Sequence, residues 1–123
     1  MKMERVLVVA AHPDDEVLGC GALIHKLVSQ GVALKVLVLG EGSTCRYSSD
    51  EIKSESALLA IQQRLGFAQD AMKVLGVEDA DFLNYPCGRF DTVPLINLGK
   101  SIESAIVEFQ PDIVFTHSPF DVN

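Results

Sequence analysis

The sequence is poor in cysteine, in basic residues and in long apolar runs, and each shortage excludes a class of protein. Its three cysteines are odd in number and form no CxxC pair, so a disulfide framework is not expected and a reducing cytoplasm fits best. Ten basic residues stand against 17 acidic ones, and the net charge of −7 argues against binding to nucleic acid or to an anionic membrane surface. No apolar run is long enough for a transmembrane segment, and the first one ends in acids, unlike a signal peptide.

The patterns that are present predict one α/β domain over residues 1–123, without repeats or linkers. Continuous apolar runs, typical of strands buried on both faces, alternate with stripes of helical period. Buried strands are predicted at residues 5–11, 32–40, 80–85 and 112–117. Helices are predicted from Glu16 to Gly31, from a capping box of Ser48 and Glu51 to Gly76, and from Pro94 to Phe109. The inward face of the last helix is predicted to be Leu95, Leu98, Ile102, Ala105 and Phe109.

This alternation predicts a Rossmann-like, doubly wound and mostly parallel sheet with helices on both faces. Binding sites in such sheets lie beyond the carboxyl ends of the strands. The polar clusters that follow the four strands are His12, residues 40–43, residues 85–91 and His117. All of them are therefore expected at one edge of the sheet.

The segment after the first strand has the sequence AHPDDE, residues 11–16, and places three acids in a row beside His12. An imidazole and a carboxylate three residues apart can converge at such a turn, and zinc accepts both as ligands. The carboxylate that is left over, Asp14, could then take a proton from a water molecule at the metal. An alternative needs no metal, because acids are also favoured in the first turn of a helix by its dipole.

The stretch AHPDDEVLGCGALI resembles the signature of the PIG-L (LmbE-like) family of zinc-dependent N-acetylglucosaminyl deacetylases. The resemblance implies that His12 and Asp15 are zinc ligands and that Asp14 is the general base. Glu16 would support the site or start the helix. Weaker similarities continue in order along the chain, in VLGEGS, in the helix that carries Arg64, and in PDIVFTHSPFDVN. Arg64 stands where the family contacts its substrate.

The chain departs from the family pattern at three places. Phe67 replaces a glutamate that is frequent in the family, and Cys87 replaces a frequent aspartate. The sequence also ends at Asn123, which resembles the first residue of the motif that supplies the third ligand, a histidine. On this interpretation the chain is an amino-terminal part of a longer catalytic domain, Asn123 binds substrate by donating a hydrogen bond, and His117 is a candidate substitute ligand. For His117 the alternative is that the ring only bonds backbone.

The prediction for function is a zinc-dependent hydrolase that removes an N-acetyl group from an amino sugar or sugar conjugate, a small-molecule substrate. The alternative is a non-catalytic ligand-binding or scaffold domain with an incomplete metal site. An exposed sheet edge could also drive association into a homo-oligomer.

Overall fold

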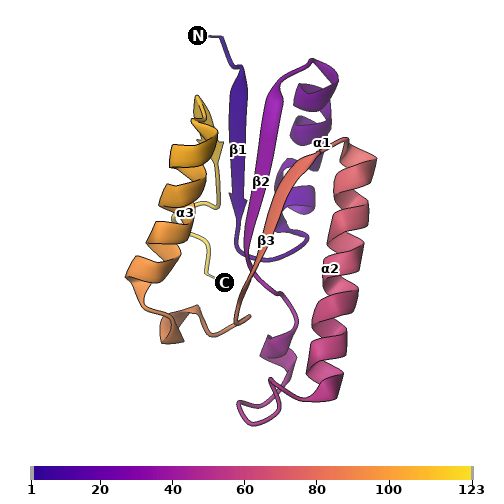
Figure 1. Ribbon diagram of the computed structural model, residues 1–123, viewed down its shortest axis with the longest axis vertical. Helices are drawn as coiled ribbons and strands as arrows, with labels where there is room; N and C mark the ends of the chain where they lie inside the picture. Colours follow the sequence, from indigo (N-terminus) through magenta and orange to yellow (C-terminus); the bar gives the residue numbers. More distant parts are fainter. Residues whose placement is uncertain (1, 123) are drawn as a thin grey trace.

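The computed structural model describes residues 2–122, and within them the chain forms a parallel sheet covered by helices on both faces. The strands are β1 (Arg5–Ala10), β2 (Ala33–Gly40), β3 (Asp79–Tyr85) and β4 (Ile113–Phe115). The main helices are α1 (Asp15–Ser29), α2 (Glu55–Leu75) and α3 (Leu95–Phe109). The strand order is β3-β2-β1-β4, and every neighbouring pair is parallel. The predicted fold class is therefore confirmed (Figure 1).

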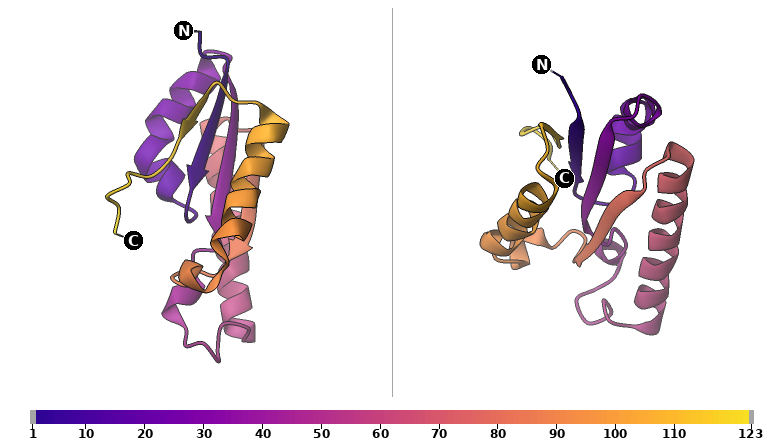
Figure 2. Two further views of the ribbon diagram at one scale, coloured as in Figure 1. Left: turned by 90° about the vertical axis from the view of Figure 1, so that its left-hand side faces the viewer. Right: turned by 45° about the horizontal axis from the view of Figure 1, so that its top comes forward.

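The two faces of the sheet carry separate apolar cores, because successive side chains of a strand point to opposite sides. Val6, Val8 and Ala10 of β1 face the core under α1 and α2. Leu7 and Val9 face the core under α3. Figure 2 shows this layering, with α3 on one side of the sheet and α1 and α2 on the other. An uninterrupted apolar run is thus what β1 requires, since both of its faces are covered.

Three local predictions are corrected by the structure. Ser48 and Glu51 do bond to one another, with the hydroxyl 2.8 Å from the carboxylate, but they close an isolated turn and do not start α2. Ser54 caps α2 instead, because its hydroxyl accepts the N–H of Ala57. Leu95 is 82% exposed, since the first turn of α3 extends past the apolar surface that buries Ala105 and Phe109. The last strand is shorter than predicted, so His117 lies beyond the end of β4.

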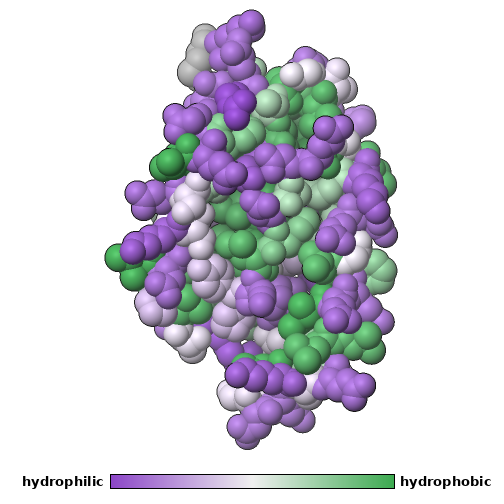
Figure 3. Space-filling view, viewed as in Figure 1, coloured by the Kyte–Doolittle hydropathy of each residue, from purple (hydrophilic) through white to green (hydrophobic). Residues whose placement is uncertain are grey.

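Apolar side chains also reach the surface, and Figure 3 shows them gathered between α3 and α2, over β3. A cavity of about 690 Å³ lies in this region, between side chains such as Leu65, Phe82 and Tyr85. β3 and β4 form the two edges of the sheet within residues 2–122. Association through such surfaces stays a prediction. No helix in this part of the chain has both the length and the apolar character needed to cross a membrane.

Candidate active site

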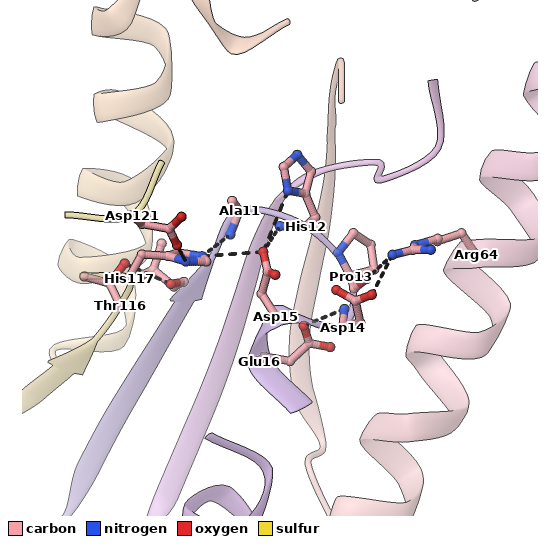
Figure 4. A network of polar contacts seen from close by, with 11 residues as sticks. Ala11, His12, Pro13, Asp14, Asp15, Glu16, Arg64, Thr116, His117 and Asp121 are labelled. Atoms are coloured by element: carbon pink, nitrogen blue, oxygen red, sulfur yellow. Dashed lines mark hydrogen bonds and ion pairs between the residues drawn. The ribbon is translucent and has the colours of Figure 1, made fainter. Parts of the chain in front are cut away.

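The turn between β1 and α1 brings the side chains of His12 and Asp15 together. The carboxylate of Asp15 accepts the backbone N–H of His12 at 2.9 Å, and the N–H of Asp15 donates to the carbonyl of His12 at 3.2 Å. These two bonds close the turn and place Nδ1 of His12 3.7 Å from Oδ2 of Asp15 (Figure 4). One imidazole and one carboxylate therefore face each other at the carboxyl edge of the sheet, where the sequence predicted them.

The ring of His12 is held in place and still keeps one nitrogen free. It packs against the ring of Phe90, with the centroids 5.3 Å apart. Its Nε2 atom is buried, and no hydrogen-bond partner for it exists among the described residues. An unpaired buried polar atom is costly, so a native structure that keeps one calls for an explanation. The other ring nitrogen, Nδ1, is the one that faces Asp15.

His117 approaches the same turn from the end of β4, but both of its ring nitrogens have partners. The N–H of Ala11 donates to Nε2 of His117 at 2.9 Å, so this nitrogen carries no proton. The proton therefore belongs to Nδ1, which donates to Oδ2 of Asp121 at 3.0 Å. Nε2 lies 3.5 Å from Oδ2 of Asp15, and in this tautomer two acceptors face each other there. His117 thus bonds both the backbone and the side chain of Asp121, and its role as a substitute ligand stays a prediction.

Asp14 and Arg64, which are 50 residues apart in the sequence, form an ion pair over the turn. The Arg64 guanidinium lies 2.8 Å from Oδ2 of Asp14 and also donates to the carbonyl of Pro13 at 2.9 Å. The backbone of Asp14 has φ 115°, a left-handed conformation that costs energy in a residue other than glycine. Such strain persists only where the surroundings impose it, and the two bonds from Arg64 help to do so.

Glu16 is only 1% exposed, which is unusual for an acid that merely starts a helix. Burial is the main cause that raises the pKa of Glu16, and the N–H groups of Glu16 and Asp14 act in the opposite direction. Its Oε2 accepts the N–H of Asp14 at 3.0 Å. Glu16 thus supports the backbone of Asp14 from below, in the supporting role that was one of the two expected for it.

Glu41, in the loop after β2, is a site residue whose role the sequence did not reveal. Its buried carboxylate accepts hydrogen bonds from the N–H groups of Ser43, Thr44 and Cys87 and from the hydroxyl of Thr44. Burial alone would raise the pKa of Glu41, but these hydrogen bonds outweigh it and leave the pKa below its ordinary value. The only signal in the sequence was the short motif GEGS, which indicates a loop and not its partners.

Arg89 reinforces the same junction, because its guanidinium donates to the carbonyls of Thr44 at 2.9 Å and Tyr47 at 2.6 Å. Together with Glu41 it joins the loops after β2 and β3 into one wall. This wall and the turn after β1 enclose a cavity of about 610 Å³. The cavity is lined by Ala11, His12, Asp14, Asp15, Gly42, Cys45, Arg46, Arg64, Cys87, Gly88, His117, Ser118 and Asp121. Asn123, the remaining predicted substrate contact, lies outside the described residues.

The donor atoms fit a metal site in part. His12 and Asp15 are the kinds of ligand that zinc takes, and catalytic zinc commonly has three protein ligands. Within residues 2–122, however, no three His, Cys, Asp or Glu side chains are grouped so that they could hold a metal ion. The described residues thus bring together two side chains of the kinds that zinc takes.

Comparison with known proteins gives consistent relatives. The family model described as PIG-L, GlcNAc-PI de-N-acetylase, matches residues 7–123. A 1D-myo-inositol 2-acetamido-2-deoxy-alpha-D-glucopyranoside deacetylase of Mycobacteroides abscessus is 31% identical, over 98% of this chain and 50% of the relative. The structure of N,N'-diacetylchitobiose deacetylase from Pyrococcus horikoshii, complexed with an inhibitor, superposes with a TM-score of 0.77 and 28% identity, over 97% of this chain and 42% of that one.

The fold also occurs in an enzyme of another class. A 4-carboxy-2-hydroxymuconate hydratase from Pseudomonas putida superposes with a TM-score of 0.75 at 23% identity, over 98% of this chain and 50% of that one. At that identity the likeness concerns the fold alone. The chain spans no more than half the length of each of these three relatives.

Proposed function

We propose a hydrolytic function for this chain, which belongs to the PIG-L family of GlcNAc-PI de-N-acetylases. The reaction is removal of the acetyl group from an N-acetylated amino sugar or its conjugate, with release of acetate and a free amine. The observation that carries the proposal is the facing pair of His12 and Asp15, with Nδ1 and Oδ2 3.7 Å apart in a cavity that Asp14 also lines. The deacetylases among the relatives support the choice of an acetamide substrate.

His12 and Asp15 would hold a zinc ion in this proposal. When bound, zinc polarises a carbonyl group and makes a water molecule acidic enough to lose a proton near neutral pH. The third ligand is proposed to be a histidine beyond Asn123, because the chain matches only part of each relative and His117 is engaged with Ala11. A two-ligand site binds zinc weakly, so this third donor decides both the affinity and the position of the water.

Asp14 is proposed as the general base that accepts the proton of the attacking water. Its carboxylate is 54% exposed and faces the cavity, whereas that of Asp15 is 30% exposed and closes the turn. The proton held at Asp14 is then available to the nitrogen that leaves. Arg64 orients this carboxylate in the absence of substrate and is proposed, with Asn123, to bind the sugar when it enters.

One observation favours the alternative of a non-catalytic ligand-binding or scaffold domain. Within residues 2–122 there is no three-ligand cluster. If the complete protein also lacks a third ligand, the cavity could still bind a sugar through Arg64 and the loops without hydrolysing it.

The deciding experiment compares the 123-residue chain with a version extended through the next histidine of the gene product. Zinc content is measured by elemental analysis and amine release from N-acetylglucosamine conjugates is followed in the same samples. We expect little zinc and little amine from the short chain and both in full from the extended one. Stoichiometric zinc in the short chain would instead show that it already contains a third ligand. Zinc without amine release in the extended chain would favour the non-catalytic alternative.

A further inference from the structure

Two thiols from different loops meet in the wall of the cavity. Cys45 lies in the short helical turn Thr44–Arg46 after β2, Cys87 lies in the loop after β3, and both line the cavity that contains His12. Burial is the main cause that raises the pKa of Cys87 to about 11, and a side-chain interaction with Cys45 raises it further. The two cysteines are therefore neighbours in the lining of one cavity.

The backbones at this point are in contact as well. A Cβ atom placed on Gly88 would lie only 3.0 Å from Cβ of Cys45 and 3.7 Å from its Cα. Gly88 has φ 71°, so glycine suits the position for two separate reasons. The loop that carries Cys87 is thus pressed against Cys45 itself.

Hydrogen bonds fix the backbone at Cys87 and next to Cys45. The N–H of Cys87 donates to Glu41 at 2.9 Å, and Arg89 donates to the carbonyl of Thr44 at 2.9 Å. These bonds fix the residues next to each cysteine. The pair is therefore part of the folded wall and not a chance approach of two mobile loops.

Exposure separates the roles that the two thiols can take. Cys45 is exposed, whereas Cys87 is only 6% exposed. We propose that Cys45 and Cys87 form an oxidant-responsive dithiol, in which a peroxide oxidises Cys45 and Cys87 then closes a disulfide between the two loops. This proposal does not depend on the proposed deacetylation, because it needs only the two thiols and the wall that holds them.

The chemistry balances with hydrogen peroxide as the oxidant. The thiolate sulfur of Cys45 attacks one peroxide oxygen, the O–O bond breaks, and a sulfenic acid and hydroxide form. The Cys87 thiol then gives up its proton, its sulfur attacks the Cys45 sulfur, and the S–O bond breaks with loss of water. In sum two thiols are oxidised to one disulfide while one peroxide is reduced to two waters. Small thiols reverse the step by exchange.

The consequence concerns the cavity. A disulfide is shorter than a contact between two thiols, so its formation draws the loop after β3 toward the loop after β2. Those loops also carry Gly42, Arg46 and Gly88, which line the same space as His12. The oxidation state of the pair is therefore expected to change the shape of the cavity.

The sequence makes a direct test simple, because trypsin would place each cysteine in its own peptide. Cys45 falls in residues 36–46, Cys87 in residues 74–89, and Cys20 in residues 6–26. The folded protein is treated with hydrogen peroxide, its remaining thiols are alkylated in denaturant, and the unreduced digest is analysed by mass spectrometry. We expect peptides 36–46 and 74–89 to appear cross-linked, to separate after reduction, and to form about tenfold faster than any product of Cys20.

Two controls make the outcome decisive. In Cys45→Ser, which changes an exposed side chain, Cys87 should stay reduced and alkylatable under the same peroxide treatment. In protein unfolded before treatment, the preference for the Cys45–Cys87 pair over pairs with Cys20 should disappear. The proposal is overturned if the folded protein keeps both thiols free, if Cys20 is cross-linked equally fast, or if Cys87 oxidises at an unchanged rate in Cys45→Ser.

Discussion

The carboxylate of Glu41 should contribute strongly to stability, and Glu41→Gln tests this. The side chain is 7% exposed and receives hydrogen bonds from Ser43, Cys87 and both polar groups of Thr44. A glutamine of nearly the same shape keeps one carbonyl oxygen. Its amide group, however, is a donor that would face other donors. About half of the hydrogen bonds should therefore be lost, with little change in volume.

The expected cost follows from the price of an unpaired buried donor. A hydrogen bond to a charged group contributes about 1.5–3 kcal/mol, and a buried donor left without an acceptor costs about 1–3 kcal/mol. Because neighbouring losses are not additive, we expect the free energy of unfolding to fall by about 3 kcal/mol near neutral pH. That is a large share of the stability of an ordinary domain.

The pH dependence has a definite sign. The pKa of Glu41 lies below its ordinary value of 4.5, so its contribution is fully present above pH 4.5 and is lost as the pH falls through the lowered pKa. The gap in stability between the wild type and Glu41→Gln should therefore be constant near neutral pH and shrink in acid.

Urea denaturation of both proteins across this pH range measures the gap, and Glu51→Gln is the matched control. Glu51 also accepts hydrogen bonds, from Ser48, but it is exposed, so its replacement should change stability far less. Equal losses in the two variants, or a gap for Glu41→Gln that widens in acid, would refute the reasoning.

The remaining predictions concern the turn after β1. Asp14→Asn should leave the zinc content of the extended protein nearly unchanged and lower kcat by about 10²–10⁴, as loss of a general base does; loss of zinc together with activity would show that Asp14 is itself a ligand. His117→Phe should cost about 1 kcal/mol in urea denaturation, because the N–H of Ala11 loses its acceptor, while zinc content stays close to that of the wild type. A collapse of zinc content in His117→Phe would instead make His117 a ligand. His12→Ala should lower zinc affinity by orders of magnitude in equilibrium dialysis, and unchanged affinity would remove His12 from the site.

Sequence reasoning succeeded where one physical cause dominates the local pattern. The run from Val6 to Ala10 is apolar at every position because both faces of β1 are covered. The convergence of His12 and Asp15 follows from their spacing across a tight turn. Both features are local, so the sequence around them was sufficient.

Where several local solutions exist, the sequence could not choose between them. Ser48 and Glu51 form the bond of a capping box, yet α2 starts at Glu55 because Ser54 competes for the same role. The exposure of Leu95 depends on how far the sheet extends under α3. The helical spacing of the apolar residues does not reveal that extent. The function of Glu41 depends on a donor in Cys87, 46 residues away.

The two histidines of the cavity show why residue type and position are insufficient to assign a site. His12 and His117 follow neighbouring parallel strands, β1 and β4, and both rings lie near the carboxylate of Asp15. Among the described residues, Nε2 of His12 has no partner, whereas both ring nitrogens of His117 are bonded. The difference arises because the N–H of Ala11 donates to Nε2 of His117, which follows β4. Among the described residues, no group makes the corresponding bond to Nε2 of His12. The capacity to bind an external ligand is therefore set by the hydrogen bonds around each ring, and these form only when the strands pair.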